Sequence, residues 1–132
     1  MSYGSHVYDA VMVPVSGRYR SDVSTTVFLN SPEDYKGGEL VIHTQYGKES
    51  VKLEAGDAVV YPSSSLHEVA EVTSGQRLVA VTWAQSMVKS TEQREMLFNI
   101  SQIRESLTSQ NDDEKARLDQ VYANLLRMWS EV

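Results

Sequence analysis

The sequence predicts a mainly β chain that ends in two amphipathic helices. Short β-branched and apolar segments recur at roughly 8–12-residue spacing through the first two-thirds of the chain, with glycine-containing turns between them. After residue 88 the apolar spacing changes to the helical period of about 3.6 residues. At 132 residues the chain fits one domain, and we expect a β core over residues 1–88 with a helical extension over 89–132 packed on it.

Six segments are expected to be strands, because each is rich in β-branched or aromatic residues or alternates between apolar and polar residues. Glycine-containing sequences such as Lys36-Gly37-Gly38 and Thr73-Ser74-Gly75 are expected to form turns between them. Short strands at this spacing are typical of a β-barrel or a sandwich. The six segments are residues 23–29, 38–44, 50–53, 58–61, 67–72 and 77–83.

Two helices are expected after the strands. Ser90, followed by Gln93 three residues later, fits a capping box, and a second helix is expected to begin near Asn111, where three acids suit the helix dipole. We expect the apolar stripes to cover the outside of the sheet, with a homodimer contact through the second stripe as the alternative. The stripes are Met96, Leu97, Ile100, Ile103 and Leu107, then Leu118, Val121, Tyr122, Leu125 and Trp129.

Composition excludes several classes of function. The net charge of −6 and the absence of a basic run argue against nucleic-acid partners, and the absence of cysteine excludes disulfide and thiolate chemistry. No apolar run approaches the roughly 20 residues that a membrane span needs. The first residues lack the apolar run of a signal peptide, so we expect no membrane association and a cytoplasmic location.

Two histidines and one arginine carry the chemistry that we expect. On a strand, residues i and i+2 point to one face, so a His-x-Asp pair and a distant histidine can bind iron together. Such a site leaves open positions for a 2-oxo acid and dioxygen. An arginine beyond the second histidine offers a bidentate fork for the far carboxylate of the co-substrate. His6, His67 and Arg77 fit these places, whereas His43 is expected to be a surface or core residue.

Several longer motifs make a resemblance specific. The chain resembles the PKHD-type hydroxylases, a bacterial branch of the prolyl 4-hydroxylase-like Fe(II)/2-oxoglutarate dioxygenases, over nearly its whole length. The matching strings include Tyr3-Gly4-Ser5-His6-Val7, Ser24-Thr25-Thr26-Val27-Phe28-Leu29, Tyr35-Lys36-Gly37-Gly38-Glu39-Leu40, Ala55-Gly56-Asp57, Tyr61-Pro62-Ser63-Ser64-Ser65-Leu66-His67 and Trp83-Ala84-Gln85-Ser86-Met87.

The resemblance implies a double-stranded β-helix, or jelly roll, with His6 and His67 as iron ligands and Arg77 as the 2-oxoglutarate anchor. It implies Fe(II), 2-oxoglutarate and ascorbate as cofactors. It also implies dioxygen and a peptidyl or small-molecule substrate as partners in a hydroxylation. Because the family has further residues upstream, we expect this chain to be a piece of a longer protein or a naturally short form. A barrel that lacks its first strand would expose a sheet edge, which a homodimer can cover.

The chain departs from the family at one ligand. The family pattern His-Val-Asp is here His6-Val7-Tyr8-Asp9. Asp9 serves as the ligand if the strand breaks after Val7, Tyr8 ligates if its phenol loses a proton, or the carboxylate ligand is lost. We predict a metal site of His6, Asp9 and His67. The alternative is a catalytically impaired jelly-roll binding module.

Overall fold

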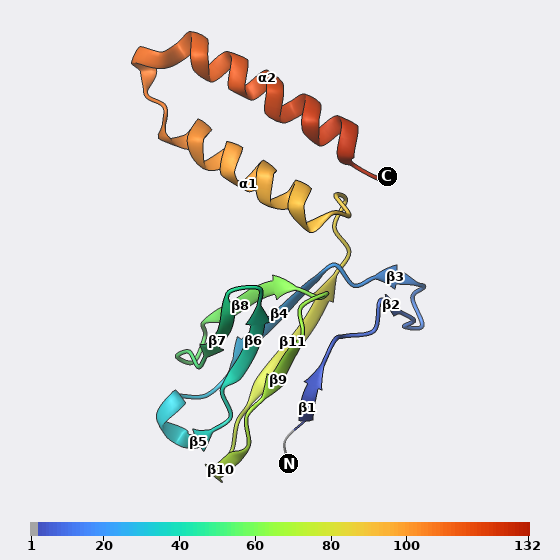
Figure 1. Ribbon diagram of the computed structural model, residues 1–132, viewed down its shortest axis with the longest axis vertical. Helices are drawn as coiled ribbons and strands as arrows, with labels where there is room; N and C mark the ends of the chain where they lie inside the picture. The colour runs from blue at the N-terminus through green and yellow to red at the C-terminus, as the bar shows by residue number, and fades with distance from the viewer. Residues whose placement is uncertain (1–2) are drawn as a thin grey trace. The chain divides into compact units, whose positions relative to one another are not determined.

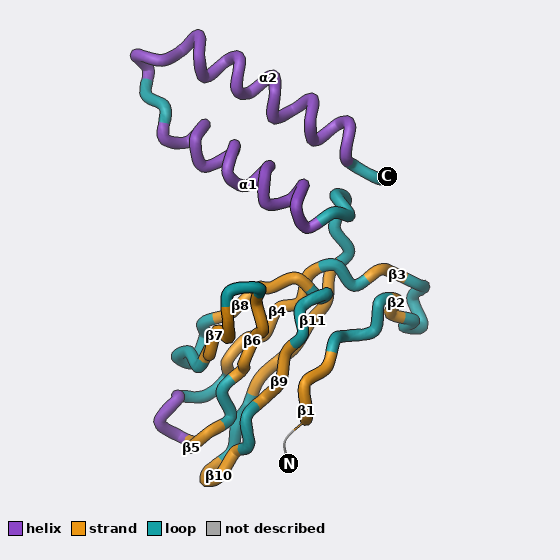
Figure 2. Tube along the Cα trace, in the orientation of Figure 1, coloured by secondary structure: helices purple, strands orange, loops and turns teal. Residues whose placement is uncertain are grey.

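Strands form the first part of the chain and helices the second (Figures 1 and 2). The computed structural model describes residues 3–132. Contacts divide the chain into two units, one ending at Gln85 and the other beginning at Ser86. The mainly β fold with two C-terminal helices is therefore as predicted. The packing of the helices on the sheet stays a prediction.

The strands pair in an antiparallel jelly roll. One sheet has the order β1 (Tyr3–His6), β9 (His67–Val69), β6 (Leu40–Thr44), β7 (Gly47–Val51). A second has the order β11 (Val79–Ala84), β4 (Val23–Phe28), β8 (Ala58–Pro62). There are also two short strand pairs, β10 (Val72–Gly75) with β5 (Tyr35–Gly37) and β2 (Val11–Met12) with β3 (Tyr19–Arg20). The 3-10 turn Pro32–Asp34 comes directly before β5. Strands far apart in sequence thus become neighbours, as in a jelly roll.

The core of the strand unit combines apolar and polar side chains. Leu40 and Ile42 of β6 form a buried cluster with Tyr61 of β8, and the partly buried Tyr8 packs against this cluster. On β4 alternate residues are buried, as expected for a strand that faces a core with one side. The buried apolar cluster therefore joins β6 of one sheet to β8 of the other. The buried positions of β4 include the polar residues Ser24 and Thr26.

Two predicted strands differ from the structure. The third strand is Gly47–Val51 rather than 50–53, and the segment predicted as 67–72 is divided into β9 and β10. The cause of the division lies in the partner strands. β9 pairs with β6 up to Val69, whereas β10 pairs with β5, because Gly37 and Gly38 both have positive φ angles and bend the partner chain between β5 and β6.

Replacing Gly37 with alanine should lower the free energy of unfolding by roughly 2–4 kcal/mol. Gly37 has a φ of 72°, and an added Cβ would overlap the carbonyl oxygen of Glu71. Chemical denaturation of the purified chain measures the change. Gly47→Ala is the matched control, since its φ is 138° but no heavy atom lies within 4 Å of the added Cβ. Equal losses in the two variants would contradict a steric role for Gly37.

The second unit is a pair of helices, α1 (Thr91–Ser106) and α2 (Asp112–Trp129), joined through the 3-10 turn Ser109–Asn111. The Ser90 side chain accepts a hydrogen bond from the Gln93 backbone N–H, so the predicted N-cap is confirmed. Arg104 of α1 forms an ion pair with Asp119 of α2. Among the described residues, no helix is long and apolar enough to cross a membrane.

Candidate metal and anion site

The two predicted histidine ligands lie opposite each other on neighbouring strands. β1 pairs with β9 in a register that places His6 against His67, and their ring centroids are 4.3 Å apart. Directly opposed residues of an antiparallel pair have adjacent side chains. The fold thus brings together two imidazoles that are 61 positions apart in the sequence.

Both imidazoles are oriented by backbone carbonyls. Nδ1 of His6 lies 2.9 Å from the carbonyl oxygen of Gly4, and Nδ1 of His67 lies 3.0 Å from that of Ser65. A carbonyl accepts only, so each Nδ1 carries the proton and each Nε2 keeps its lone pair. Metal-binding histidines are held in this way.

His67 is the more buried of the two. It is 1% exposed, and its Nε2 has no hydrogen-bond partner in the part of the chain that the structure describes. Burial lowers the pKa of His67, the hydrogen bond to Ser65 opposes this shift, and the nearby His6 adds to it. A neutral buried imidazole with an unpaired acceptor nitrogen fits an Fe(II) ligand.

Tyr8 occupies the position where the family has its carboxylate. Its ring centroid lies 4.3 Å from that of His67 and 5.2 Å from the nearer ring of Trp83, and its hydroxyl lies 3.1 Å from that of Tyr61. Burial raises the pKa of Tyr8 well above its ordinary value, and the hydrogen bond to Tyr61 raises it further. The phenol therefore stays protonated and is a poor ligand for Fe(II).

Asp9 does not join the histidines. It is exposed, and its backbone carbonyl accepts a hydrogen bond from the Ser21 hydroxyl. β1 ends at His6, one residue before the break after Val7 that the Asp9 interpretation assumes. Even so, residues 3–132 contain no group of three His, Cys, Asp or Glu side chains placed to hold a metal. His43, which we did not predict as a ligand, instead lies 3.6 Å from a Glu68 carboxylate oxygen.

The side chain of Arg77 is half-buried. It lies between β10 and β11, two residues before the start of the strand on which we expected it. Its Nε is buried without a hydrogen-bond partner, its guanidinium carbon lies 6.0 Å from the centroid of the Phe28 ring, and no carboxylate of the described residues pairs with it. An uncompensated buried guanidinium is costly unless an anion accompanies it. Arg77 therefore fits a carboxylate ligand.

Two further buried donors lie outside the predicted site residues. The hydroxyl of Tyr35 and Nε1 of Trp83 are buried without hydrogen-bond partners among the described residues. The position of Tyr35 in the Tyr-Lys-Gly-Gly string was the available signal, but the string alone does not show which way its ring points.

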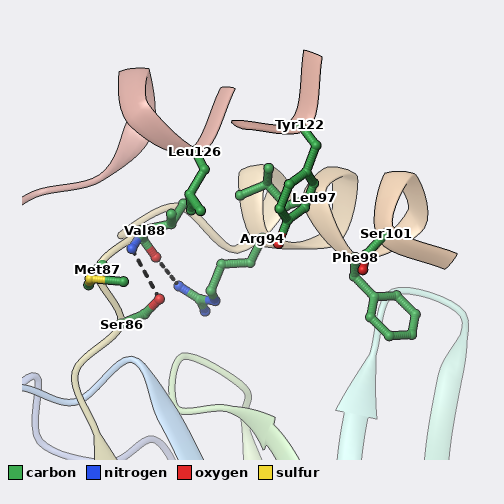
Figure 3. Close-up of a pocket in the computed structure, with 9 residues that line it drawn as sticks. All are labelled: Ser86, Met87, Val88, Arg94, Leu97, Phe98, Ser101, Tyr122 and Leu126. Atoms are coloured by element: carbon green, nitrogen blue, oxygen red, sulfur yellow. Dashed lines mark hydrogen bonds between the residues drawn. The ribbon is translucent and has the colours of Figure 1, made fainter. Parts of the chain in front are cut away.

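The helical unit has a cavity of its own, of about 310 Å³ (Figure 3). Leu97 of α1 and Tyr122 of α2 both line it. The guanidinium of Arg94 donates to the carbonyls of Val88 and Lys89, so it anchors the segment that leads into α1. This cavity contains none of the predicted site residues, all of which belong to the strand unit.

Comparison with known proteins shows the family of the chain. Residues 1–85 match the family model described as the 2OG-Fe(II) oxygenase superfamily, and residues 92–131 match the PKHD-type hydroxylase C-terminal domain. The chain is similar to a PKHD-type hydroxylase of Thioalkalivibrio sulfidiphilus, with 54% identity over 134 residues covering 100% of this chain and 60% of the relative. It is also similar to one from Shewanella baltica strain OS155, with 49% identity over 133 residues covering 99% of this chain and 59% of the relative. The chain thus spans about three-fifths of the length of these relatives.

Proposed function

The chain belongs to the 2OG-Fe(II) oxygenase superfamily and, within it, to the PKHD-type hydroxylases, and we propose that it forms the catalytic part of an Fe(II)- and 2-oxoglutarate-dependent dioxygenase. The reaction would hydroxylate a peptidyl or small-molecule substrate. The observation that carries the proposal is the pair of carbonyl-oriented histidines, with ring centroids 4.3 Å apart, in the same unit as a half-buried arginine whose buried Nε has no partner among residues 3–132.

Each residue has a defined part in this proposal. His6 and His67 would hold Fe(II) through Nε2, and the guanidinium of Arg77 would bind the distal carboxylate of 2-oxoglutarate. Iron, when bound with 2-oxoglutarate and dioxygen, supplies the oxidising chemistry, and ascorbate is included as its reductant. The protein contributes orientation and a partly dry interior, in which Tyr8 and Trp83 would exclude water beside the metal position.

The third protein ligand separates two candidate functions. The first candidate is an active dioxygenase, in which the Asp9 side chain must turn toward the metal or a water molecule must be the third ligand. The second candidate is a catalytically impaired binding module. Tyr8 favours this module, because its neutral ring lies beside His67, where the carboxylate ligand is expected. Such a module would retain the histidine pair and the arginine and would not turn over.

Anaerobic addition of Fe(II) and then 2-oxoglutarate should produce the visible charge-transfer absorption of a 2-oxo acid chelated to Fe(II). His67→Ala should abolish the band, since it removes the buried imidazole ligand. His43→Ala is the matched control and should leave the band unchanged. A folded parent chain without the band would refute iron and 2-oxoglutarate binding. A band without succinate formation under oxygen would support the impaired module.

A further inference from the structure

The hydroxyl of Tyr35 is a buried hydrogen-bond donor that the proposed function does not use. Tyr35 is 3% exposed, and no described residue accepts a hydrogen bond from its hydroxyl. A buried polar group without a partner is rare in folded proteins, because it loses its hydrogen bonds to water and gains none in return. Such a group points to a ligand that completes it.

The side chains of Tyr35 and Arg77 both lie next to Gly38. A Cβ built on Gly38 would lie 3.0 Å from Cε2 of Tyr35 and 3.1 Å from Cδ of Arg77. The two side chains therefore converge on the space that the missing side chain of Gly38 leaves, and Gly38, with a φ of 71°, is suited to this position. The buried Nε of Arg77 and the buried hydroxyl of Tyr35, both without partners, thus belong to one cluster.

Lys52 holds Tyr35 in place without engaging the hydroxyl. Its Nζ donates to the backbone carbonyl of Tyr35 at 2.8 Å and lies 4.1 Å from the centroid of the Tyr35 ring. Burial raises the pKa of Tyr35, Arg77 opposes the shift and the Glu39 carboxylate adds to it, so the hydroxyl keeps the proton that it would donate. The Tyr35 hydroxyl and the Arg77 guanidinium are therefore two donors of the kind that bind a carboxylate.

We propose that the Tyr35 hydroxyl and the Arg77 guanidinium together bind the distal carboxylate of the 2-oxo acid, so that Tyr35 selects a dicarboxylic over a monocarboxylic co-substrate. The inference rests on the proposed function. The Tyr35 hydroxyl would give the carboxylate a second hydrogen-bond donor besides Arg77. Phe28, the ring beside the guanidinium, cannot donate a hydrogen bond because it has no polar atom. Loss of one donor to a buried carboxylate should cost more affinity than loss of the same hydroxyl at the surface.

Tyr35→Phe tests the assignment, because it removes the hydroxyl and keeps the ring. With Mn(II) in place of Fe(II), calorimetric titration should show the affinity for 2-oxoglutarate falling about tenfold or more. The affinity for 2-oxobutyrate, which lacks the distal carboxylate, should stay unchanged. Tyr46→Phe removes the hydroxyl of a tyrosine that is 91% exposed and should change neither affinity.

A second readout separates binding from folding. Because no residue from 3 to 132 pairs with the hydroxyl, Tyr35→Phe should not lower the melting temperature of the ligand-free chain. The rise in melting temperature with 2-oxoglutarate should shrink in this variant. Unchanged 2-oxoglutarate affinity in Tyr35→Phe, or equal losses of affinity for the two 2-oxo acids, would overturn the role of Tyr35. The proposed function would still stand if Arg77→Ala loses 2-oxoglutarate binding. A parent chain that binds no 2-oxoglutarate would overturn both.

Discussion

Replacing Arg77 with alanine should weaken 2-oxoglutarate binding at least about thirtyfold and leave the affinity for a divalent metal unchanged. Truncating one partner of a buried charge pair costs about 2–5 kcal/mol, because the other charge is left without its counterion. The guanidinium carbon lies 6.0 Å from the centroid of the Phe28 ring, and Cδ of Arg77 lies next to Gly38. Neither Phe28 nor Gly38 is among the predicted metal ligands. The two affinities should therefore separate in calorimetric titrations of the parent chain and the variant.

Two control variants sharpen this result. Arg77→Lys keeps the charge and loses the planar fork, so it should give an intermediate affinity. Arg18→Ala removes an exposed arginine and should change nothing. Without ligand, Arg77→Ala should unfold at the same temperature as the parent chain or a higher one, since the buried Nε of Arg77 has no hydrogen-bond partner among the described residues. Parallel loss of metal and 2-oxoglutarate binding, or retention of both, would contradict the anchor role.

Local patterns predicted most of the fold because most of its elements have local causes. The β-branched and apolar character of residues 23–29 predicted β4, and the Ser90 and Gln93 pair predicted the start of α1. The division of the segment 67–72 could not be predicted in this way. It depends on the paired strand, in which Gly37 and Gly38 bend the backbone, and a pairing partner is not visible in a single segment.

The candidate site shows the same limit. Resemblance to a known family indicated His6 and His67, and the register of β1 with β9 brings them together as that resemblance required. It did not indicate Tyr35, whose relation to Arg77 depends on how β5 and β10 place the two side chains over Gly38. It also could not decide between Tyr8 and Asp9, because the strand ends at His6 and the two-residue alternation no longer determines direction.

Restoring a carboxylate with Tyr8→Asp should raise the affinity for Fe(II) or Mn(II) by at least about tenfold. Residues that only orient a metal ligand already contribute about 10–100-fold to affinity, so a direct ligand should contribute no less. The ring centroids of Tyr8 and His67 are 4.3 Å apart, so an acid at position 8 would lie beside the same imidazole. Anaerobic metal titration of the two chains measures the difference.

The same substitution should destabilise the metal-free chain. Tyr8 packs against the Leu40, Ile42 and Tyr61 cluster and pairs with the Tyr61 hydroxyl, so its loss should cost about 3 kcal/mol by leaving a cavity and an unpaired hydroxyl. Added metal should recover part of this loss, because it binds only the folded state. A larger metal-dependent rise in melting temperature for Tyr8→Asp than for the parent chain is therefore expected.

Asp9→Ala distinguishes the two sources of the third ligand. The exposed position of Asp9 predicts that this variant keeps the metal affinity of the parent chain. If Asp9 instead turns inward when metal binds, Asp9→Ala should lose affinity and Tyr8→Asp should gain little, because the third position is already filled. Tyr8→Phe completes the comparison. It keeps the ring and removes the hydroxyl, so any loss of metal affinity would identify the phenol oxygen as a ligand despite its raised pKa.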